Sequence, residues 1–259
     1  MAIADKVDSL VCLIAAGEKI SGSYDQFGLR RMAIGVIRTI LENNLHVPIR
    51  PLIDKSVSLY SRLAFTKDIT PASNPHKQTR RYIASLVCMF CIERFKVILR
   101  NRGVSQGIVD SILWIDINGL LTAEKQTVIL DHYLSTSEGE QILSTYKRVS
   151  NMVNKVRKND DTAYDIFYNK LLLIENEEVA LSSYATFFYK SVEQAMKNGD
   201  LNAALDKLTR LTPFINKFMD SVKINCDSDK LRRNRLSLLA NIFSIFHLVA
   251  NFNLIKVKQ

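Results

Sequence analysis

The residues with the clearest chemical potential are cations gathered in two stretches of the chain. One stretch, at 229–235, opens a long apolar pattern and reads Asp-Lys-Leu-Arg-Arg-Asn-Arg, while the other, from Lys147 to Lys158, holds five cations and no carboxylate. Like charges this close repel one another, and cations at a helix N-terminus cost about 0.3–1 kcal/mol each. A phosphate backbone would neutralise both groups. The alternative is ordinary solvated arginines paired with nearby carboxylates.

Two other patterns have residue types that can support chemistry at a single site. Cys88 and Cys91 have the spacing of a redox or zinc motif, but they lie inside an apolar helical stretch rather than at a turn, so we interpret them as core residues. Asp5 and Asp8 share a helix face, yet two carboxylates without a histidine cluster are weak evidence for a metal. We predict no metal site and no catalytic residue, because the sequence contains no phosphate-binding glycine loop, nucleophile elbow or histidine-rich cluster.

The composition favours a helical, cytoplasmic protein with an anionic partner. Lys and Arg total 35 against 26 Asp and Glu, which gives a net charge of +9 and favours a polyanion such as RNA or DNA. With 9 Gly and 5 Pro there is little material for a turn-rich β fold. The 4 scattered Cys suit a reducing compartment. The sequence shows neither a signal peptide nor an apolar run long enough to span a bilayer.

Apolar residues recur at helical spacing through the first half of the chain. The first stripe, from Ile3 to Ile14, has no capping residue before it, so we expect the sequence to be a fragment of a longer protein. Further patterns predict helices at 27–43, 48–63, 79–102, 105–114 and 123–133, with a loop at 65–78. Trp114 is interpreted as a packing anchor.

The second half has the pattern of an antiparallel bundle of five helices with short connectors. Ser137 and Glu140 have the spacing of a capping box and open a helix that runs to residue 158. After an irregular segment at 159–172, helices are predicted at 175–197 and 201–211. Thr212 and Pro213 predict an N-cap and a first-turn proline that start a separate helix at 214–224. The last helix is predicted at 227–251, capped by Asp227, Ser228 or Asp229.

Two blocks of the bundle resemble the DALR-type anticodon-binding domain found at the C-terminus of some aminoacyl-tRNA synthetases. They are 147–152 (Lys-Arg-Val-Ser-Asn-Met) and 229–236 (Asp-Lys-Leu-Arg-Arg-Asn-Arg-Leu). With 4–11 (Ala-Asp-Lys-Val-Asp-Ser-Leu-Val) and 27–38 (Phe-Gly-Leu-Arg-Arg-Met-Ala-Ile-Gly-Val-Ile-Arg), the whole chain is similar to the C-terminal part of the beta subunit of bacterial, tetrameric glycyl-tRNA synthetase. It departs from that family at 224–227 (Ile-Asn-Cys-Asp), where a more acidic Val-Asp-Asp is common, and in the 65–78 loop.

The resemblance implies an all-α fold: the tail of an HD-like domain at 1–20, a helical body at 21–135 and a DALR-type antiparallel bundle at 136–259. Asp5 and Asp8 would be a relic of the HD-like architecture. The family enzyme joins glycine to its tRNA using ATP, with the chemistry, ATP and Mg on the alpha subunit and tRNA recognition on the beta subunit. The resemblance therefore implies a glycine–tRNA ligase portion that is not catalytic alone, holds no cofactor or metal, and has tRNA-Gly and the alpha subunit as partners.

The candidate tRNA contacts are the polar residues of the two basic stretches. Cations would neutralise phosphates or stack with bases, and the asparagines would bond base edges. These candidates are Lys147, Arg148, Asn151, Lys155, Lys158, Arg232, Arg233, Asn234 and Arg235. Because the first and last helices of such a bundle often lie adjacent, we expect one joint surface. The alternative function is a non-catalytic helical scaffold that docks partner subunits. Which anticodon bases are read is left open.

Overall fold

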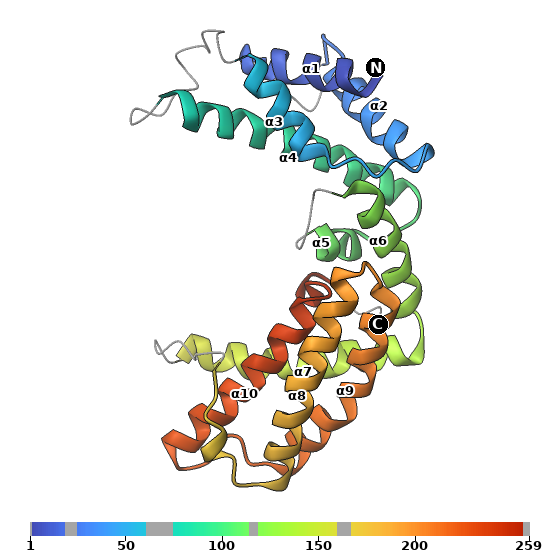
Figure 1. The fold of residues 1–259 in the computed structure, drawn as a ribbon. Helices are drawn as coiled ribbons and strands as arrows, with labels where there is room; N and C mark the ends of the chain where they lie inside the picture. Colours follow the sequence, from blue (N-terminus) through green and yellow to red (C-terminus); the bar gives the residue numbers. More distant parts are fainter. Residues whose placement is uncertain (1, 19–24, 61–74, 114–118, 160–166, 256–259) are drawn as a thin grey trace. The chain divides into compact units, whose positions relative to one another are not determined.

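The computed structural model describes residues 2–18, 25–60, 75–113, 119–159 and 167–255, with the backbone alone at 75–79 and 155–159. In these ranges all regular secondary structure is helical (Figure 1), so the predicted all-α fold is confirmed. The α-helices are α1 (Ala2–Ala15), α2 (Leu29–Glu42), α3 (Ile49–Leu59), α4 (Pro75–Asn101), α5 (Gln106–Leu113), α6 (Leu120–Leu134), α7 (Ser137–Asn159), α8 (Asn176–Lys197), α9 (Leu201–Ser221) and α10 (Asp229–His247). Two short 3-10 helices are η2 (Lys170–Leu172) and η3 (Phe252–Leu254).

Several sequence predictions fall wholly or partly outside the described residues. Trp114 lies outside them, as does most of the 65–78 loop, whose last residues from Pro75 instead belong to α4. The irregular segment predicted at 159–172 is described only from residue 167 onward, apart from Asn159 at the end of α7. Among the described helices, none is long and apolar enough to cross a membrane.

The chain divides into two compact units. The first contains Met1–Val109 and Asp116–Lys125, and the second contains Asp110–Ile115 and Gln126–Gln259. Helices α1 to α4 pack together in the first unit, and α7 to α10 pack together in the second. The domain boundaries expected at residues 20 and 135 stay a prediction.

Helix α1 is central to the first unit, where it packs against α2, α3 and α4. Its buried stripe follows the predicted helical spacing: Val7, Leu10, Val11 and Ile14. On its polar side, the Asp8 carboxylate accepts hydrogen bonds from the hydroxyls of Ser56 (2.8 Å) and Tyr60 (2.6 Å) at α3. Asp8 therefore ties α1 to α3. In the described part of the chain no group of three or more His, Cys, Asp and Glu side chains is placed to hold a metal.

The bond from Tyr60 to Asp8 makes this phenol hard to ionise. The hydrogen bond to Asp8, and to a lesser extent burial, raises the pKa of Tyr60 from 10.0 to about 12. The protonated phenol therefore stabilises the fold fully below pH 10, and this contribution is lost as the pH rises through about 12. We expect Tyr60→Phe to cost about 1–2 kcal/mol at neutral pH. Carbon NMR of labelled tyrosines checks the titration, and a Tyr60 that ionises together with the exposed tyrosines would contradict it.

Cys88 and Cys91 are core residues of α4, as predicted. Both side chains are buried, and all four cysteines of the chain are free thiols. Burial raises the pKa of Cys91 to about 12 and also raises the pKa of Cys88, so neither forms the reactive thiolate readily. Within the native chain we expect maleimide to label the partly exposed Cys12 and Cys226 first, and the α4 pair only after unfolding. Mass spectrometry of timed samples checks this order, which rapid native labelling of Cys88 would overturn.

The second unit is a bundle of four long helices. Figure 1 shows α8 and α9 as a hairpin, and their turn is closed by Asp200, whose carboxylate accepts a hydrogen bond from the Ala203 amide (2.9 Å). Helix α7 crosses against α9 and α10. At that crossing the Tyr146 ring stacks on Phe243, with centroids 5.3 Å apart, and meets Phe246 edge-on. This aromatic cluster joins the first and last helices of the bundle.

The bundle has one helix fewer than predicted, because α9 continues through Pro213. Thr212 does not cap a new helix; it is buried, and its hydroxyl donates to the carbonyl of Leu208 (3.0 Å). The residues that form the buried stripe lie on both sides of the proline and are fully buried: Leu208, Leu211, Ile215 and Phe218. Each contributes about 1.5–3 kcal/mol by burial, which together outweighs the cost of about 3 kcal/mol for an interior proline.

The start of α7 also differs from the prediction. Thr136 caps it, one residue before the predicted Ser137, because the Thr136 hydroxyl accepts a hydrogen bond from the Gly139 amide (3.2 Å). The turn from α6 into α7 is so tight that a Cβ atom on Gly139 would lie 2.2 Å from the Tyr133 carbonyl oxygen. The N-terminus of α7 therefore lies in a tight turn that requires glycine at the third residue of the helix.

Candidate nucleic-acid interface

The start of α10 presents cations to solvent at the helix end that disfavours them. Of the three predicted caps, Ser228 is the one used, and its hydroxyl accepts a hydrogen bond from the Leu231 amide (3.5 Å). Arg232 is partly exposed and pairs with Asp229 at 2.7 Å, while Arg233 is exposed. The helix is shorter than predicted at both ends.

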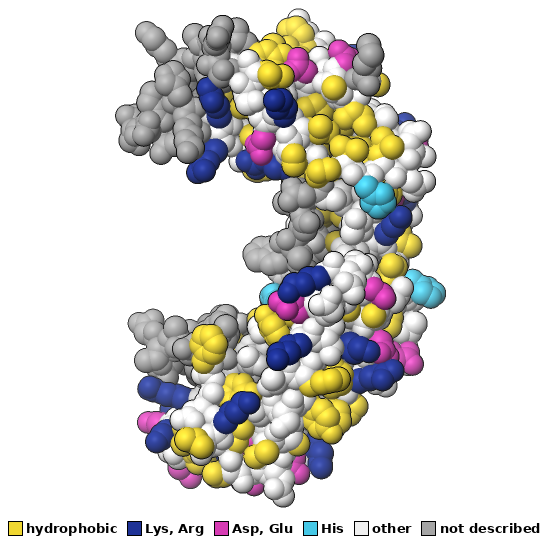
Figure 2. Space-filling model, in the orientation of Figure 1, with side chains coloured by type: hydrophobic (Ala, Val, Ile, Leu, Met, Phe, Trp, Pro, Cys, Tyr) yellow, Lys and Arg dark blue, Asp and Glu magenta, His cyan; other side chains and the backbone are white. Residues whose placement is uncertain are grey.

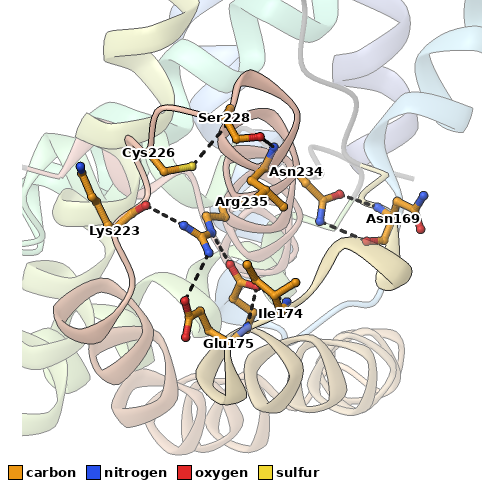
Figure 3. A network of polar contacts seen from close by, with 10 residues as sticks. Asn169, Ile174, Glu175, Lys223, Cys226, Ser228, Asn234 and Arg235 are labelled. Atoms are coloured by element: carbon orange, nitrogen blue, oxygen red, sulfur yellow. Dashed lines mark hydrogen bonds and ion pairs between the residues drawn. The ribbon is translucent and has the colours of Figure 1, made fainter.

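Arg235 points into the protein instead of toward solvent. Its guanidinium Nε donates to Oε1 of Glu178 on α8. Another of its nitrogens donates to the Lys223 carbonyl (2.8 Å; Figure 3). The Glu178 side chain is 0% exposed, and its other oxygen accepts hydrogen bonds from the amides of Ile174 (2.7 Å) and Glu175 (3.1 Å). Both members of this buried ion pair therefore have further hydrogen-bond partners, which is the condition under which such a pair is tolerated.

Asn234 is buried beside it and also bonds within the protein. Its side-chain oxygen accepts from the Asn169 amide (2.7 Å), and its side-chain nitrogen donates to the Asn169 carbonyl (3.1 Å; Figure 3). The two residues at the inner face of α10 thus hold the segment before α8 at both ends. The side chains of Asn234 and Arg235 are thus buried and bonded within the protein, and the RNA contact expected of them from the sequence stays a prediction.

On α7, the candidate side chains of Lys147, Arg148 and Asn151 are exposed. The Arg148 guanidinium donates to the Asn216 side-chain oxygen (2.9 Å) and pairs with Asp220, so it bridges α7 and α9. The side chains of Lys155 and Lys158, near the end of α7, lie outside the described residues.

The structure places Lys147, at one end of the basic stretch of α7, away from the start of α10. Tyr146, next to Lys147, contacts the second half of α10 through Phe243, whereas the exposed Arg233 lies ten residues earlier. That separation corresponds to roughly 15 Å along the helix axis. Figure 1 shows the far end of α7 and the start of α10 at the left of the bundle, and Figure 2 shows Lys and Arg side chains spread across this face with hydrophobic ones among them. This spread of cations suits a ligand with several anionic groups along its length better than it suits one small anion.

The segment that precedes α8 was missed by the sequence reasoning, which treated it as an irregular connector. It carries three exposed large apolar residues, Phe167, Leu171 and Ile174, beside the basic start of α10. The available signal was the short run Leu-Leu-Leu-Ile at 171–174, which is apolar yet too short for a helix of its own.

Two protein families match this chain, each over a different part of it. Residues 1–114 match the family described as glycyl-tRNA synthetase beta subunit, and residues 142–257 match the DALR anticodon binding domain. The chain is 28% identical over 256 residues to the glycine–tRNA ligase beta subunit of Actinobacillus pleuropneumoniae serotype 3, and 30% identical over 253 residues to that of Rickettsia canadensis. These matches cover 99% and 98% of this chain.

The chain spans about a third of the length of the curated relatives that it matches, with 34% of each covered. The first matched family covers α1 to α5, and the second covers nearly all of the bundle from α7 to η3. The chain is therefore homologous to a region of the glycyl-tRNA synthetase beta subunit, and its bundle matches the DALR anticodon binding domain.

Proposed function

We propose that this chain supplies anticodon recognition for a glycine–tRNA ligase, as a portion of its beta subunit. The observation that carries the proposal is that the part matching an anticodon-binding domain folds as a bundle with exposed cations on α7 and α10. Cations that are held apart on a rigid surface suit the regularly spaced phosphates of an RNA strand.

In this proposal, different exposed side chains bind different parts of the RNA. Lys147, Arg232 and Arg233 neutralise phosphates, joined by Lys155 and Lys158, which follow Lys147 in the sequence by eight and eleven residues. Arg148 reaches a phosphate by exchanging its carboxylate partner Asp220, and the amide of Asn151 bonds a base edge. Asn234 and Arg235 act indirectly, because from their buried positions on α10 they hold the segment that borders these cations.

The reaction of the whole enzyme is part of the proposal. Glycine is joined to tRNA-Gly at the expense of ATP on the alpha subunit, where ATP and Mg are held, in a cytoplasmic tetrameric assembly. The chain described here would bind and orient the tRNA for that reaction, and would have no ligase activity alone. Its partners would be tRNA-Gly and the alpha subunit.

Binding of a glycine tRNA transcript at two salt concentrations tests the proposal, with a second transcript whose anticodon bases are replaced. We expect binding that weakens steeply with salt, and that weakens further when the anticodon is changed. Equal binding of both transcripts would reduce the surface to a general polyanion site. Absence of binding at low salt would contradict the proposal.

One observation favours the alternative, a scaffold that docks protein. The exposed face of α8 carries Val179, Tyr184 and Phe187, and no charged residue lies between Glu178 and Lys190. Such a face suits a dry protein interface, whose affinity depends little on salt. The salt series therefore separates the two functions, because a docked alpha subunit would stay bound where RNA dissociates.

A further inference from the structure

The segment between α7 and α8 exposes apolar side chains in a way that the fold does not require. Leu171 is 91% exposed, Phe167 is 76% exposed and Ile174 is 63% exposed. Single apolar residues on a surface are ordinary, but three large ones within eight residues mark a contact surface. We name Phe167–Ile174 the apolar segment.

The apolar segment is held in place by many hydrogen bonds. Near its start, the Asn169 backbone is clamped through both its amide and its carbonyl by the Asn234 side chain. The Asn169 side chain in turn accepts from the Leu171 amide (2.9 Å), which closes the 3-10 turn. At its end, the Ile174 amide donates to Glu178, which is paired with Arg235. The backbone that carries the exposed side chains is thus preorganised, which lowers the conformational entropy lost on binding.

The charges around the apolar segment identify the class of its occupant. Its one charged side chain is Lys170, which is exposed, and the exposed Arg233 directly precedes the Asn234 clamp in α10. The carboxylates nearby in these elements already have cationic partners: Asp229 pairs with Arg232, and Glu175 with Arg235. An aromatic face beside cations is the arrangement that binds unpaired nucleotides, with the base stacked and its phosphates neutralised.

We propose that Phe167 and Leu171 form a stacking surface for an unpaired base of the bound RNA, with Asn234 and Arg235 as the residues that position it. This inference rests on the proposed function and adds to it a site for a base that the basic residues alone do not provide. The adjacent Lys170 and Arg233 would hold the phosphates on either side of that base.

The test is the affinity of the full chain for a glycine tRNA transcript after the double substitution Phe167→Ala/Leu171→Ala. Loss of base stacking predicts binding weaker by roughly 5- to 100-fold. The slope of log affinity against log salt should stay unchanged, because no phosphate contact is removed. Phe187→Ala is the matched control, since Phe187 is 62% exposed on α8 of the same bundle. A transcript with 2-aminopurine in its anticodon loop should also lose fluorescence quenching with the double variant alone.

The outcomes separate this inference from the proposed function. If the wild-type chain discriminates the anticodon but the double variant binds as well as Phe187→Ala, the stacking surface is wrong and anticodon recognition stands. If the wild-type chain does not bind the transcript, both fail. If the double variant instead loses binding of the alpha subunit while RNA affinity is kept, the apolar segment is a protein contact.

A further variant tests the positioning role of Asn234. Asn234→Ala should speed hydrogen exchange at the amides of 169–174 and weaken RNA binding in the wild-type background. It should add little in the Phe167→Ala/Leu171→Ala background, because the side chains that it positions are already gone. An equal loss in both backgrounds would assign Asn234 a general structural role and contradict positioning.

Discussion

Replacing Arg235 by alanine is expected to destabilise the second unit by about 3–5 kcal/mol, the largest stability loss among the substitutions considered. The substitution leaves the Glu178 carboxylate, which is 0% exposed, without its cation. It also removes the donor to the Lys223 carbonyl. An uncompensated buried charge is far more costly than the pair is favourable, and the whole stability of a domain is about 5–15 kcal/mol.

Calorimetry of the variant, following the transition of the second unit, measures this loss. Arg232→Ala is the control, because it removes a guanidinium three residues away whose partner Asp229 is exposed. An exposed pair of this kind contributes about 0–1 kcal/mol. Equal losses for the two variants would show that the Arg235 pair is no more important than a surface pair.

The second large effect concerns the exposed cations. Removing three of them with Lys147→Gln, Arg232→Gln and Arg233→Gln should lower the slope of log affinity for tRNA against log salt by about 2 to 3. Each phosphate contact contributes about 0.7–0.9 to that slope through release of counterions. The affinity loss should accordingly be greatest at low salt and small at high salt.

A control with the same change in net charge separates contact from general attraction. Lys190→Gln, Lys197→Gln and Lys207→Gln remove three cations from the halves of α8 and α9 that lie nearer their connecting turn, whereas the start of α10 contacts the beginning of α8 through Arg235 and Glu178. These changes should slow association slightly through the weaker field and leave the slope nearly unchanged. Equal slopes for the two triple variants would mean that the bound RNA does not follow the proposed cations.

Tyr146 and Pro213 show how the packing of helices modifies what their sequences predict. The aromatic cluster around Tyr146 follows from apolar spacing in α7 and α10, although the sequence did not show which aromatic rings would meet. Pro213 predicted a helix start, but a continuous buried stripe across it kept α9 in one piece. Local rules give the preference of each residue, and burial against neighbours decides where preferences conflict.

The sequence by itself determined the helical fold class, the buried faces of most helices, and the core role of Cys88 and Cys91. It also indicated the family, because blocks of residues that resemble the family occur along this chain in the same order. The fold class and the buried faces depend on local periodicity, which neighbouring residues along the chain define.

Only the tertiary structure decided which residues of the Arg-Arg-Asn-Arg stretch at 232–235 face solvent. Four polar residues in a row have no periodicity that marks an inner face, and a buried arginine is stable only where a carboxylate meets it. The carboxylate that meets Arg235 is Glu178, 57 positions earlier in the chain, and the backbone that meets Asn234 is at Asn169. Long-range packing of α8 against α10 therefore separates the residues buried in the bundle from those left at its surface.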